Sequence, residues 1–440
     1  MAEDDHVPSG RLRRLSRLAY LTARTTGDLL AQQARRKLSG KPTDGEELRR
    51  AGERILATLG ELKGAALKLG QALAMDPDAL PEEARGVVAK LLSQAPQRMD
   101  HETVAQVIRA ELGKDPDALY ARFDRTPMAA ASLGQVHAAT LHDGREVVVK
   151  VQYPGVDKAL ESDLSNAAVL VRGLAMTGES LDQRAYYDEL KASLLRELDY
   201  LEEAAQAEAY AAAAIRYPEL VVPKPVRELT SRKVLTLDRL EGVPLLDFIE
   251  SGKSLSDTER FRVGRLLVFA IWGPFYAERL VHADPHPGNF LVRADGRLSV
   301  LDFGATKLLS ERFASVYRVF FDENAQGRAH PDVGPMLKKA GFRFLSDDEE
   351  DAFELCQKLA DVVQRPILAE EYDFGAEALF RDVKAAFRSA PALALSIKPP
   401  PEAMLFYRSA SGLALDLRLL RARGPFRSVL KEIMARGSAW

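Results

Sequence analysis

The chain has 440 residues, of which 46% are hydrophobic and 28% are charged, a composition typical of folded globular domains. The 61 Lys and Arg residues nearly balance the 64 Asp and Glu residues, so the net charge gives no reason to expect a nucleic-acid partner. The single cysteine, Cys356, excludes an internal disulfide framework and a CxxC metal site and fits a reducing compartment.

Secretion and membrane insertion are not indicated either. The longest strongly apolar run without a charge, residues 266–277, has twelve residues, whereas a spanning helix needs about 20. The N-terminus begins acidic and offers no apolar secretory core. The sequence therefore predicts a cytoplasmic protein.

The first predicted element is a basic amphipathic helix. Residues 11–41 carry nine Arg and Lys residues and one acidic residue, Asp28, with leucines at roughly helical spacing. Such a helix can lie on an anionic membrane surface, which would make the protein peripheral to a membrane. It can also pack its leucines on the body of the protein, and the sequence leaves both interpretations open.

Helices are predicted as far as about residue 115. Thr43 followed three residues later by Glu46 is a capping-box pattern, which predicts a long helix over 47–74. Two further helices are expected, over 81–94 and 100–112.

Strands and helices then alternate. Apolar alternation on both sides of the turn sequence HDGR predicts a β-hairpin of 129–140 and 146–152. Helices are expected over 164–171 and 186–214, before three short strands at 221–222, 226–229 and 234–237. Beyond Gly242 the pattern is mainly helical, with a second capping box at Ser256 and Glu259 and one more hairpin at 289–292 and 298–301.

The strongest chemical signal is the segment VHADPHPGNF at 281–290, followed by LDFG at 301–304. Asp284 and Asn289 lie five positions apart in one loop and can divide the work of phosphoryl transfer. The carboxylate would orient or deprotonate the attacking group, and the amide oxygen would bind a metal. Asp302 adds a second hard oxygen, so Asn289 and Asp302 are the candidate Mg²⁺ ligands.

This pair of motifs resembles the catalytic and metal-binding loops of the protein-kinase-like superfamily. On that likeness Asp284 is the catalytic aspartate. Lys150, which ends the run VVVK, matches the strand lysine that contacts the α- and β-phosphates of ATP. The HPGN sequence also resembles that of the aminoglycoside and choline kinases. This loop alone therefore does not decide between the branches of the superfamily.

The segment before that lysine is unusual. Where a typical kinase has GxGxxG, this chain has a run that includes Ala129, Ala130, Ala131, Ser132 and Gly134. Glycine permits positive φ and lets backbone N–H groups close over phosphates, and alanine removes most of that freedom. We expect a stiffer nucleotide loop that holds ATP in a different pose.

The alanine-rich loop with its tail SLGQVH resembles the UbiB/ADCK family of atypical kinases. Two further matches support this resemblance, which covers roughly residues 10–310. Lys68 and Gln71 match the family's KxGQ motif and share a helix face, because they lie three positions apart. Glu197 and Asp199 match its ExD motif and would anchor the lysine.

The resemblance implies an α+β, two-lobed protein-kinase-like fold with an N-terminal helical extension packed over the active site. The expected parts are a basic helix with the KxGQ extension (1–115), an N-lobe with a helical insertion (116–241) and a mainly helical C-lobe (242–440). The KxGQ helix would cover the pocket where a protein kinase admits its peptide.

Three more site residues follow from this resemblance. Glu203, four positions after Asp199, fits the acidic partner of Lys150. Adenine is expected beside the connector between the lobes. Backbone groups of Asp238 and Leu240 would make the contacts to its edge.

The sequence therefore predicts an atypical kinase or ATPase that uses ATP and Mg²⁺. By resemblance it acts in isoprenoid-lipid metabolism, above all ubiquinone biosynthesis, with a lipid intermediate or proteins of that pathway as partners. Bacterial UbiB proteins usually end in hydrophobic membrane helices, whereas residues 426–440 here carry several charges, so the basic N-terminal helix is the remaining candidate for membrane contact.

Two alternatives compete with this interpretation. One is a small-molecule phosphotransferase of the aminoglycoside or choline kinase type. The KxGQ and ExD motifs argue against it, because such enzymes need an open acceptor pocket. The other is a scaffold that is regulated by nucleotide without turnover, and the intact catalytic positions argue against that one.

Overall fold

The computed structural model describes residues 98–131, 133–158, 198–251, 255–345, 349–376 and 379–437. The chain forms two compact units, Met1–Asp100 with Ala129–Gln135 and Gln152–Glu179, and His101–Met128 with Val136–Val151 and Ser180–Trp440. Several predictions lie outside the described residues: the helices over 11–41, 47–74, 81–94 and 164–171, and the motif residues Lys68, Gln71, Ser132 and Glu197.

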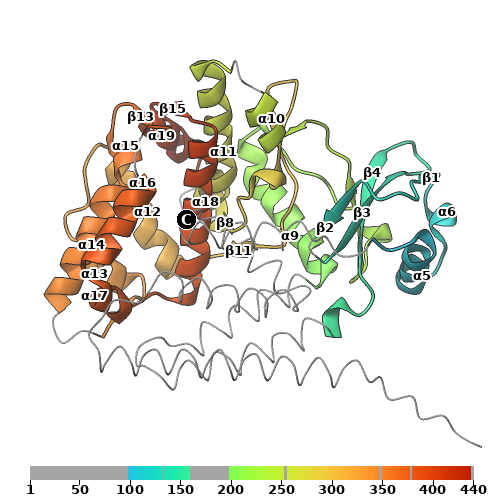
Figure 1. Cartoon of the computed structure of the whole chain (residues 1–440), viewed down its shortest axis with the longest axis horizontal. Coiled ribbons are helices and arrows are strands. Elements are labelled where there is room, and N and C mark those ends of the chain that lie inside the picture. Colours follow the sequence, from blue (N-terminus) through green and yellow to red (C-terminus); the bar gives the residue numbers. More distant parts are fainter. Residues whose placement is uncertain are drawn as a thin grey trace, which may run out of the picture. The chain divides into compact units, whose positions relative to one another are not determined.

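The N-terminal half of the described chain builds an antiparallel sheet (Figure 1). Helix α5 (His101–Leu112) and the single turn α6 (Pro116–Leu119) lead into β1 (Arg122–Phe123). The strands then run in the order β1–β3–β4–β6, with β3 at Gly134–Thr140, β4 at Glu146–Gln152 and β6 at Val234–Asp238; β2 (Ala129–Ala131) pairs with β3. The hairpin predicted around HDGR is confirmed as β3 and β4, and Gly144 in its turn has a φ of +88°. Its first strand, predicted as one run over 129–140, is wrong in its first part, because β2 pairs with β3 and does not continue it.

Strand β4 presents its two faces to different neighbours. Val147, Val149 and Val151 are fully buried on one face. On the other face Lys150 lies opposite Leu235 of β6, so their side chains point the same way. That face meets α9 (Tyr200–Ala213), because Leu235 and Leu237 form a cluster with Tyr200 and Ala204 of that helix.

The predicted helix over 186–214 is wrong at 198–199. Helix α9 begins at Tyr200, and the backbone of Asp199 is extended. The Asp199 carboxylate caps the helix by accepting a hydrogen bond from Leu201 N at 3.0 Å. A capping side chain therefore interrupts a run whose Ala, Leu and Glu content favours helix.

The strand predicted at 226–229 is also wrong. Arg227–Leu229 form a 3₁₀ turn, and pairing with β6 ends before them, with the bridge of Pro225 to Leu237 and a hydrogen bond from Val226 N to Thr236 O at 2.9 Å. The hydroxyl of Thr230 donates to Val226 O at 2.9 Å and so closes the turn. A local side-chain bond here competes successfully with strand pairing.

Helix α11 (Asp257–Glu278) is the centre of the remaining fold. It starts at the predicted capping box of Ser256 and Glu259, which is confirmed. The twelve-residue apolar run at 266–277 is buried along its whole length, so it is a core helix. Among the described residues no helix is long and apolar enough to cross a membrane.

Figure 1 shows α12 to α19 gathered on one side of α11. These helices are α12 (Glu311–Ala325), α13 (Val333–Lys339), α14 (Glu349–Val363), α15 (Arg365–Leu368), α16 (Leu379–Ser389), α17 (Pro391–Ser396), α18 (Pro401–Leu419) and α19 (Phe426–Arg436). Two short strand pairs join them, β12 (Arg343–Phe344) with β14 (Ile397–Lys398) and β13 (Tyr372–Asp373) with β15 (Arg423–Gly424).

Two small sheets lie next to α11. The predicted hairpin at 289–301 is confirmed as β9 (Phe290–Val292) and β10 (Leu298–Val300), in a sheet ordered β5–β10–β9–β7. Its outer strands are β5 (Leu220–Val221) and β7 (Val243–Pro244), and α10 (Leu245–Ser251) follows β7. The second sheet pairs β8 (Leu280–His282) with β11 (Thr306–Leu308). Helices and strands together make the α+β class predicted from the sequence.

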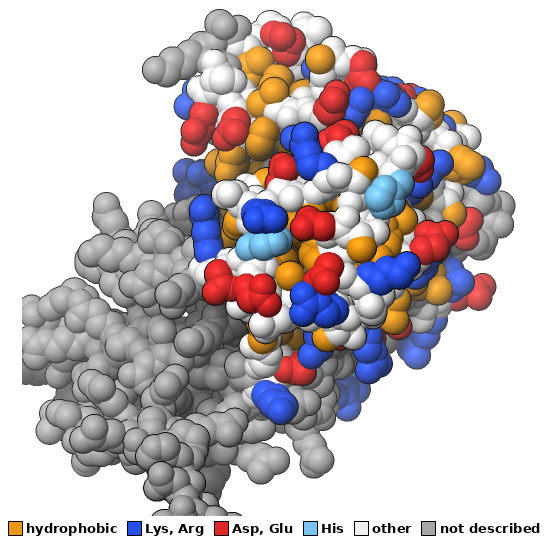
Figure 2. Space-filling view, turned by 90° about the vertical axis from the view of Figure 1, so that its right-hand side faces the viewer, with side chains coloured by type: hydrophobic (Ala, Val, Ile, Leu, Met, Phe, Trp, Pro, Cys, Tyr) orange, Lys and Arg blue, Asp and Glu red, His pale blue; other side chains and the backbone are white. Residues whose placement is uncertain are grey.

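Charge is mixed on one face of the described part of the chain. Figure 2 shows basic and acidic side chains interspersed on the face that it presents. This distribution agrees with the near balance of 61 basic and 64 acidic residues in the sequence.

One buried acid stands apart from the ion pairs. Asp416 on α18 is 1% exposed, and among the described residues neither of its carboxylate oxygens has a hydrogen-bond partner. Burial raises the pKa of Asp416 well above its ordinary value. The folded chain therefore binds this proton more tightly than the unfolded chain, and the free energy of unfolding falls as the pH rises above about 4.

We expect Asp416→Asn to remove this pH dependence, because an amide does not ionise. The midpoint of thermal unfolding should rise by several degrees at pH 8 and change little near pH 4. Circular dichroism melts between pH 4 and 8 measure the difference. Asp332→Asn, at an exposed position, is the matched control. An equal shift of the midpoint at every pH would contradict the assignment.

Candidate active site

The residues of the VHADPHPGNF segment form a tight loop between β8 and β9. Asn289 ends a 3₁₀ turn (Pro287–Asn289), and its Nδ2 donates to Asp284 O at 2.9 Å. This bond uses the nitrogen end of the carboxamide, so a metal contact would come from its oxygen. Two candidate residues, Asp284 and Asn289, are thus held in one fixed geometry.

His282 connects this loop to the LDFG segment. Its side chain is 1% exposed, and its Nε2 lies 2.5 Å from Asp302 O. Burial lowers the pKa of His282, which favours the neutral imidazole. Nδ1 then accepts from Asp284 N at 3.4 Å while Nε2 donates to Asp302 O. One neutral ring therefore bonds to the backbone of both aspartates.

Lys150 lies between two carboxylates. Its Nζ is 2.5 Å from Glu203 Oε1 and 3.7 Å from Asp302 Oδ2. Burial opposes the charged form, yet Asp302 and Glu203 together raise the pKa of Lys150 above its ordinary value. The structure therefore brings together Lys150, Glu203 and Asp302, and the lysine is charged at neutral pH.

The two carboxylate oxygens of Asp302 lie near different partners. Its Oδ1 accepts from Gly304 N at 3.0 Å, while its Oδ2 is the atom near Lys150. The carboxylate is 39% exposed, so it can still meet a ligand. Its oxygen and the amide oxygen of Asn289 are hard donors of the kind that Mg²⁺ prefers. In the described part of the chain no cluster of three His, Cys, Asp or Glu residues forms a metal site.

Aromatic packing ties α9 to this loop. The ring of Tyr210 on α9 lies 5.8 Å from that of His282 and 5.1 Å from that of Phe303. Its hydroxyl donates to Ala270 O on α11 at 2.6 Å. Tyr210 and Glu203 belong to the same helix. The aromatic packing of Tyr210 therefore also helps to fix the position of Glu203 beside Lys150.

Arg408 is a functional candidate that the sequence reasoning missed. This residue of α18 places Nη2 2.6 Å from Asp284 Oδ1, although 124 residues separate the two. The next residue, Ser409, donates from its hydroxyl to His282 O at 2.8 Å. Nothing local in the sequence around Arg408 distinguishes it from an ordinary helical arginine, so only the tertiary structure identifies it.

Among the remaining predicted site residues that the structure describes are those of the alanine-rich loop and Asp199. The loop with Ala129, Ala130 and Gly134 belongs to the first compact unit, whereas Lys150 belongs to the second. Asp199 caps α9 and pairs with Arg232 Nε at 3.1 Å.

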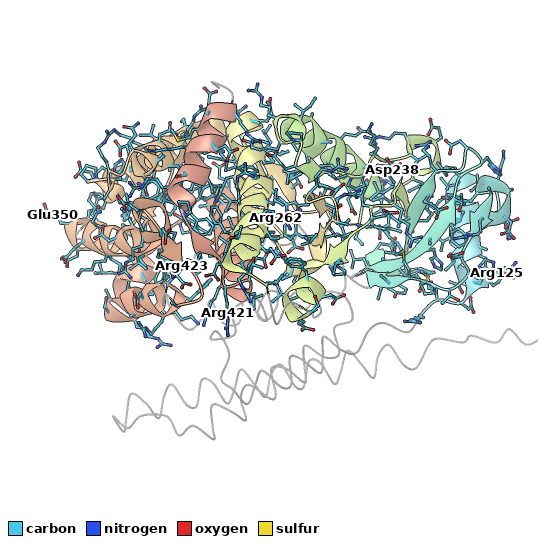
Figure 3. All side chains as sticks on the ribbon, turned by 90° about the horizontal axis from the view of Figure 1, so that it is seen from above. Arg125, Asp238, Arg262, Glu350, Arg421 and Arg423 are labelled. Carbon is cyan, nitrogen blue, oxygen red and sulfur yellow. The ribbon has the colours of Figure 1, made fainter. Side chains whose placement is uncertain are left out.

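The connector predicted to meet adenine follows β6. Asp238, labelled in Figure 3, ends that strand, and its backbone N–H donates to Lys224 O at 3.0 Å. A contact from Asp238 to an adenine edge would therefore have to use its carbonyl. Leu240, two residues on, is half-buried.

We expect Glu203→Gln to destabilise the fold, because it leaves the buried ammonium of Lys150 with a single, more distant carboxylate. The free energy of unfolding should fall by about 2 kcal/mol. Urea unfolding followed by circular dichroism measures it. Glu202→Gln changes the exposed neighbour and serves as the control. Equal stability of the two variants would show that the ion pair does not matter to the fold.

Comparison with known proteins bears on this site. Residues 90–327 match the family model of the ABC1 atypical kinase-like domain. The rat protein named Atypical kinase COQ8B, mitochondrial, is 30% identical over 437 residues, covering 97% of this chain and 81% of that protein. Atypical kinase COQ8, mitochondrial, from Schizosaccharomyces pombe is 29% identical over 407 residues, covering 90% of this chain and 65% of that protein.

The likeness extends to a kinase of another name and to a solved structure. The mouse AarF domain-containing protein kinase 1 is 36% identical over 278 residues, covering 61% of this chain and 51% of that protein. A solved structure of Rv3197 with erythromycin, from Mycobacterium tuberculosis, superposes with a TM-score of 0.56 at 29% identity. That match covers 88% of this chain and 97% of the other.

Proposed function

The chain belongs to the ABC1 atypical kinase-like family, the UbiB/ADCK kinases, and on that premise we propose that it hydrolyses Mg·ATP in the service of ubiquinone biosynthesis. An enzyme of the atypical kinase type uses ATP, and the relatives named COQ8 support the pathway. An isoprenoid lipid intermediate is the proposed partner.

The observation that carries the proposal is the cluster of Lys150, Glu203 and Asp302 beside the Asp284 loop. A charged lysine, fixed by Glu203, is suited to hold the α- and β-phosphates. Asn289 and Asp302 would hold Mg²⁺, which when bound neutralises charge on the phosphate oxygens. Asp284 would then orient the attacking oxygen and accept its proton.

The chain after Asp302 supports water or a small acceptor over a peptide. Only eight residues, 303–310, separate Asp302 from the start of α12. Part of this segment is strand β11, which pairs with β8 so that Thr306 lies opposite His282. Protein kinases carry their activation loop at this point. A segment this short and this firmly paired provides no platform on which a peptide could dock.

A small-molecule phosphotransferase is the second candidate, because a small acceptor would suit the same short segment. The solved relative from Mycobacterium tuberculosis is a complex with erythromycin, so macrolides belong in an acceptor panel beside aminoglycosides and choline. Transfer of phosphate to any of these, at a rate above that of hydrolysis, would favour this candidate.

Two other observations bear on where in the cell the protein works. The COQ8 relatives carry the word mitochondrial in their names, and the basic segment 11–41 has the composition of a membrane-surface helix. We propose that the protein is peripheral to an anionic membrane, where an isoprenoid lipid would be found.

We expect Lys150→Ala and Asp302→Asn each to lower the rate of ATP hydrolysis about 100-fold or more, since each removes a charge aimed at phosphate or metal. Phosphate release with Mg²⁺ present measures the rate, and omission of Mg²⁺ should have the same effect. Asp247→Asn, on the exposed side of α10, is the control. If the wild-type chain binds ATP without releasing phosphate, the proposal of an enzyme is wrong and that of a nucleotide-regulated scaffold replaces it.

Arg408 should act on turnover more than on nucleotide binding. Its guanidinium meets the carboxylate of Asp284, which acts on the attacking group rather than on ATP. We expect Arg408→Met to lower kcat about 10-fold to 100-fold and to leave the KM for ATP within about threefold. Arg418→Met, further along α18 and exposed, should change neither constant. A raised KM with unchanged kcat would place Arg408 at the nucleotide instead.

A further inference from the structure

Gln135, which follows the alanine-rich loop, is bonded to a distant part of the chain. Its Oε1 accepts from Met99 N at 3.1 Å and its Nε2 donates to Met99 O at 3.3 Å. The side chain is 1% exposed. Both polar ends of the carboxamide thus pair with one residue, in the way that a strand residue pairs with its neighbour.

Residues 133–135, called here the corner of the loop, are also hydrogen-bonded to a second segment of the chain. Leu133, two residues before Gln135, accepts a hydrogen bond on its carbonyl from Tyr153 N at 3.0 Å. The side chain of Leu133 is 4% exposed. Met99, Leu133, Gln135 and Tyr153 all belong to the first compact unit, so the bonds lie within one body.

These bonds join the alanine-rich loop to two other segments, one just before α5 and one just after β4. Met99 is among the last residues before α5, and Tyr153 directly follows β4. Ala129–Ala131 form strand β2, which leads into this corner and is the first part of the proposed nucleotide loop. Backbone N–H groups hold phosphate only when their positions are fixed, so whatever fixes this corner also sets how the loop meets ATP.

We propose that Gln135 is a positioning residue through which the segment 98–100 holds the alanine-rich loop in its working conformation. The part that concerns ATP rests on the proposed function. The part that concerns the loop stands on the Gln135–Met99 and Leu133–Tyr153 bonds and does not depend on ATP.

The chemistry of the bond gives a sharp set of variants. Gln135→Glu keeps the shape, but it replaces the donor that faces Met99 O with an acceptor. Gln135→Met fills a similar space and removes both bonds. If Gln135 acted through packing alone, the isosteric Gln135→Glu would be the milder change. A positioning role through hydrogen bonds makes it the more severe one, because it leaves buried acceptors facing each other.

The test is amide hydrogen exchange of the full-length protein without nucleotide. In Gln135→Glu we expect exchange about tenfold faster in peptides that cover 98–100 and 129–135, with a smaller increase in Gln135→Met. Peptides that cover β8 and β9 should exchange as in the wild type. Gln106→Met, at an exposed position of α5, is the control and should leave all rates unchanged.

Steady-state hydrolysis then tests the part that concerns ATP. We expect the KM for ATP to rise about threefold to tenfold in Gln135→Glu, with kcat within about twofold of the wild type. Unchanged exchange in the loop peptides would overturn the proposal. So would a smaller increase in exchange in Gln135→Glu than in Gln135→Met. Faster loop exchange with an unchanged KM would overturn its nucleotide part.

Two further outcomes separate this proposal from the function it builds on. If Gln135→Glu does not fold, Gln135→Met decides, with the same local increase in exchange expected. If the wild-type protein does not hydrolyse ATP, the proposed function fails. The exchange experiment then still accepts or rejects the role of Gln135 in the loop.

Discussion

A lysine charge held largely out of water sets the conditions for the rest of this fold. The Lys150 side chain is 14% exposed, and burial alone would favour its neutral form. Glu203 and Asp302 reverse that preference only because α9 and the chain after β10 hold both carboxylates near the strand. The sheet, the helix and the loop therefore have to be in place together.

The C-terminal helices complete the same site. Arg408 and Ser409, neighbours on α18, reach the side chain of Asp284 and the backbone of His282. His282 in turn bonds to the backbone of Asp302. The lysine cluster and the Asp284 loop thus meet at Asp302. A helix more than a hundred residues further along the chain contributes to the geometry of both.

The shortness of the segment after Asp302 bears on function as strongly as the charged residues do. Strand β11 uses its backbone to pair with β8, so little free chain is left before α12. Under the proposed function, the same arrangement that rigidifies the site favours a small acceptor. Fold and proposed chemistry are consistent at this point, because water or a small acceptor needs no docking platform.

Local patterns account for most of the fold that could be predicted. The HDGR hairpin, the capping box at Ser256 and the hairpin of β9 and β10 are set by residues a few positions apart, and all three are confirmed. The strand predicted at 226–229 and the helix predicted through Asp199 are wrong. There, single side chains, Thr230 and Asp199, bond to nearby backbone and override the average preference of the segment.

The sequence by itself determined the family and predicted the residues suited to phosphate chemistry, because the catalytic motifs are short and their spacing follows from local geometry. Only the tertiary structure decided which residues support them. Arg408 meets Asp284 across 124 residues, and Gln135 meets Met99 across 36. No periodicity records such contacts, because they depend on how separate elements pack.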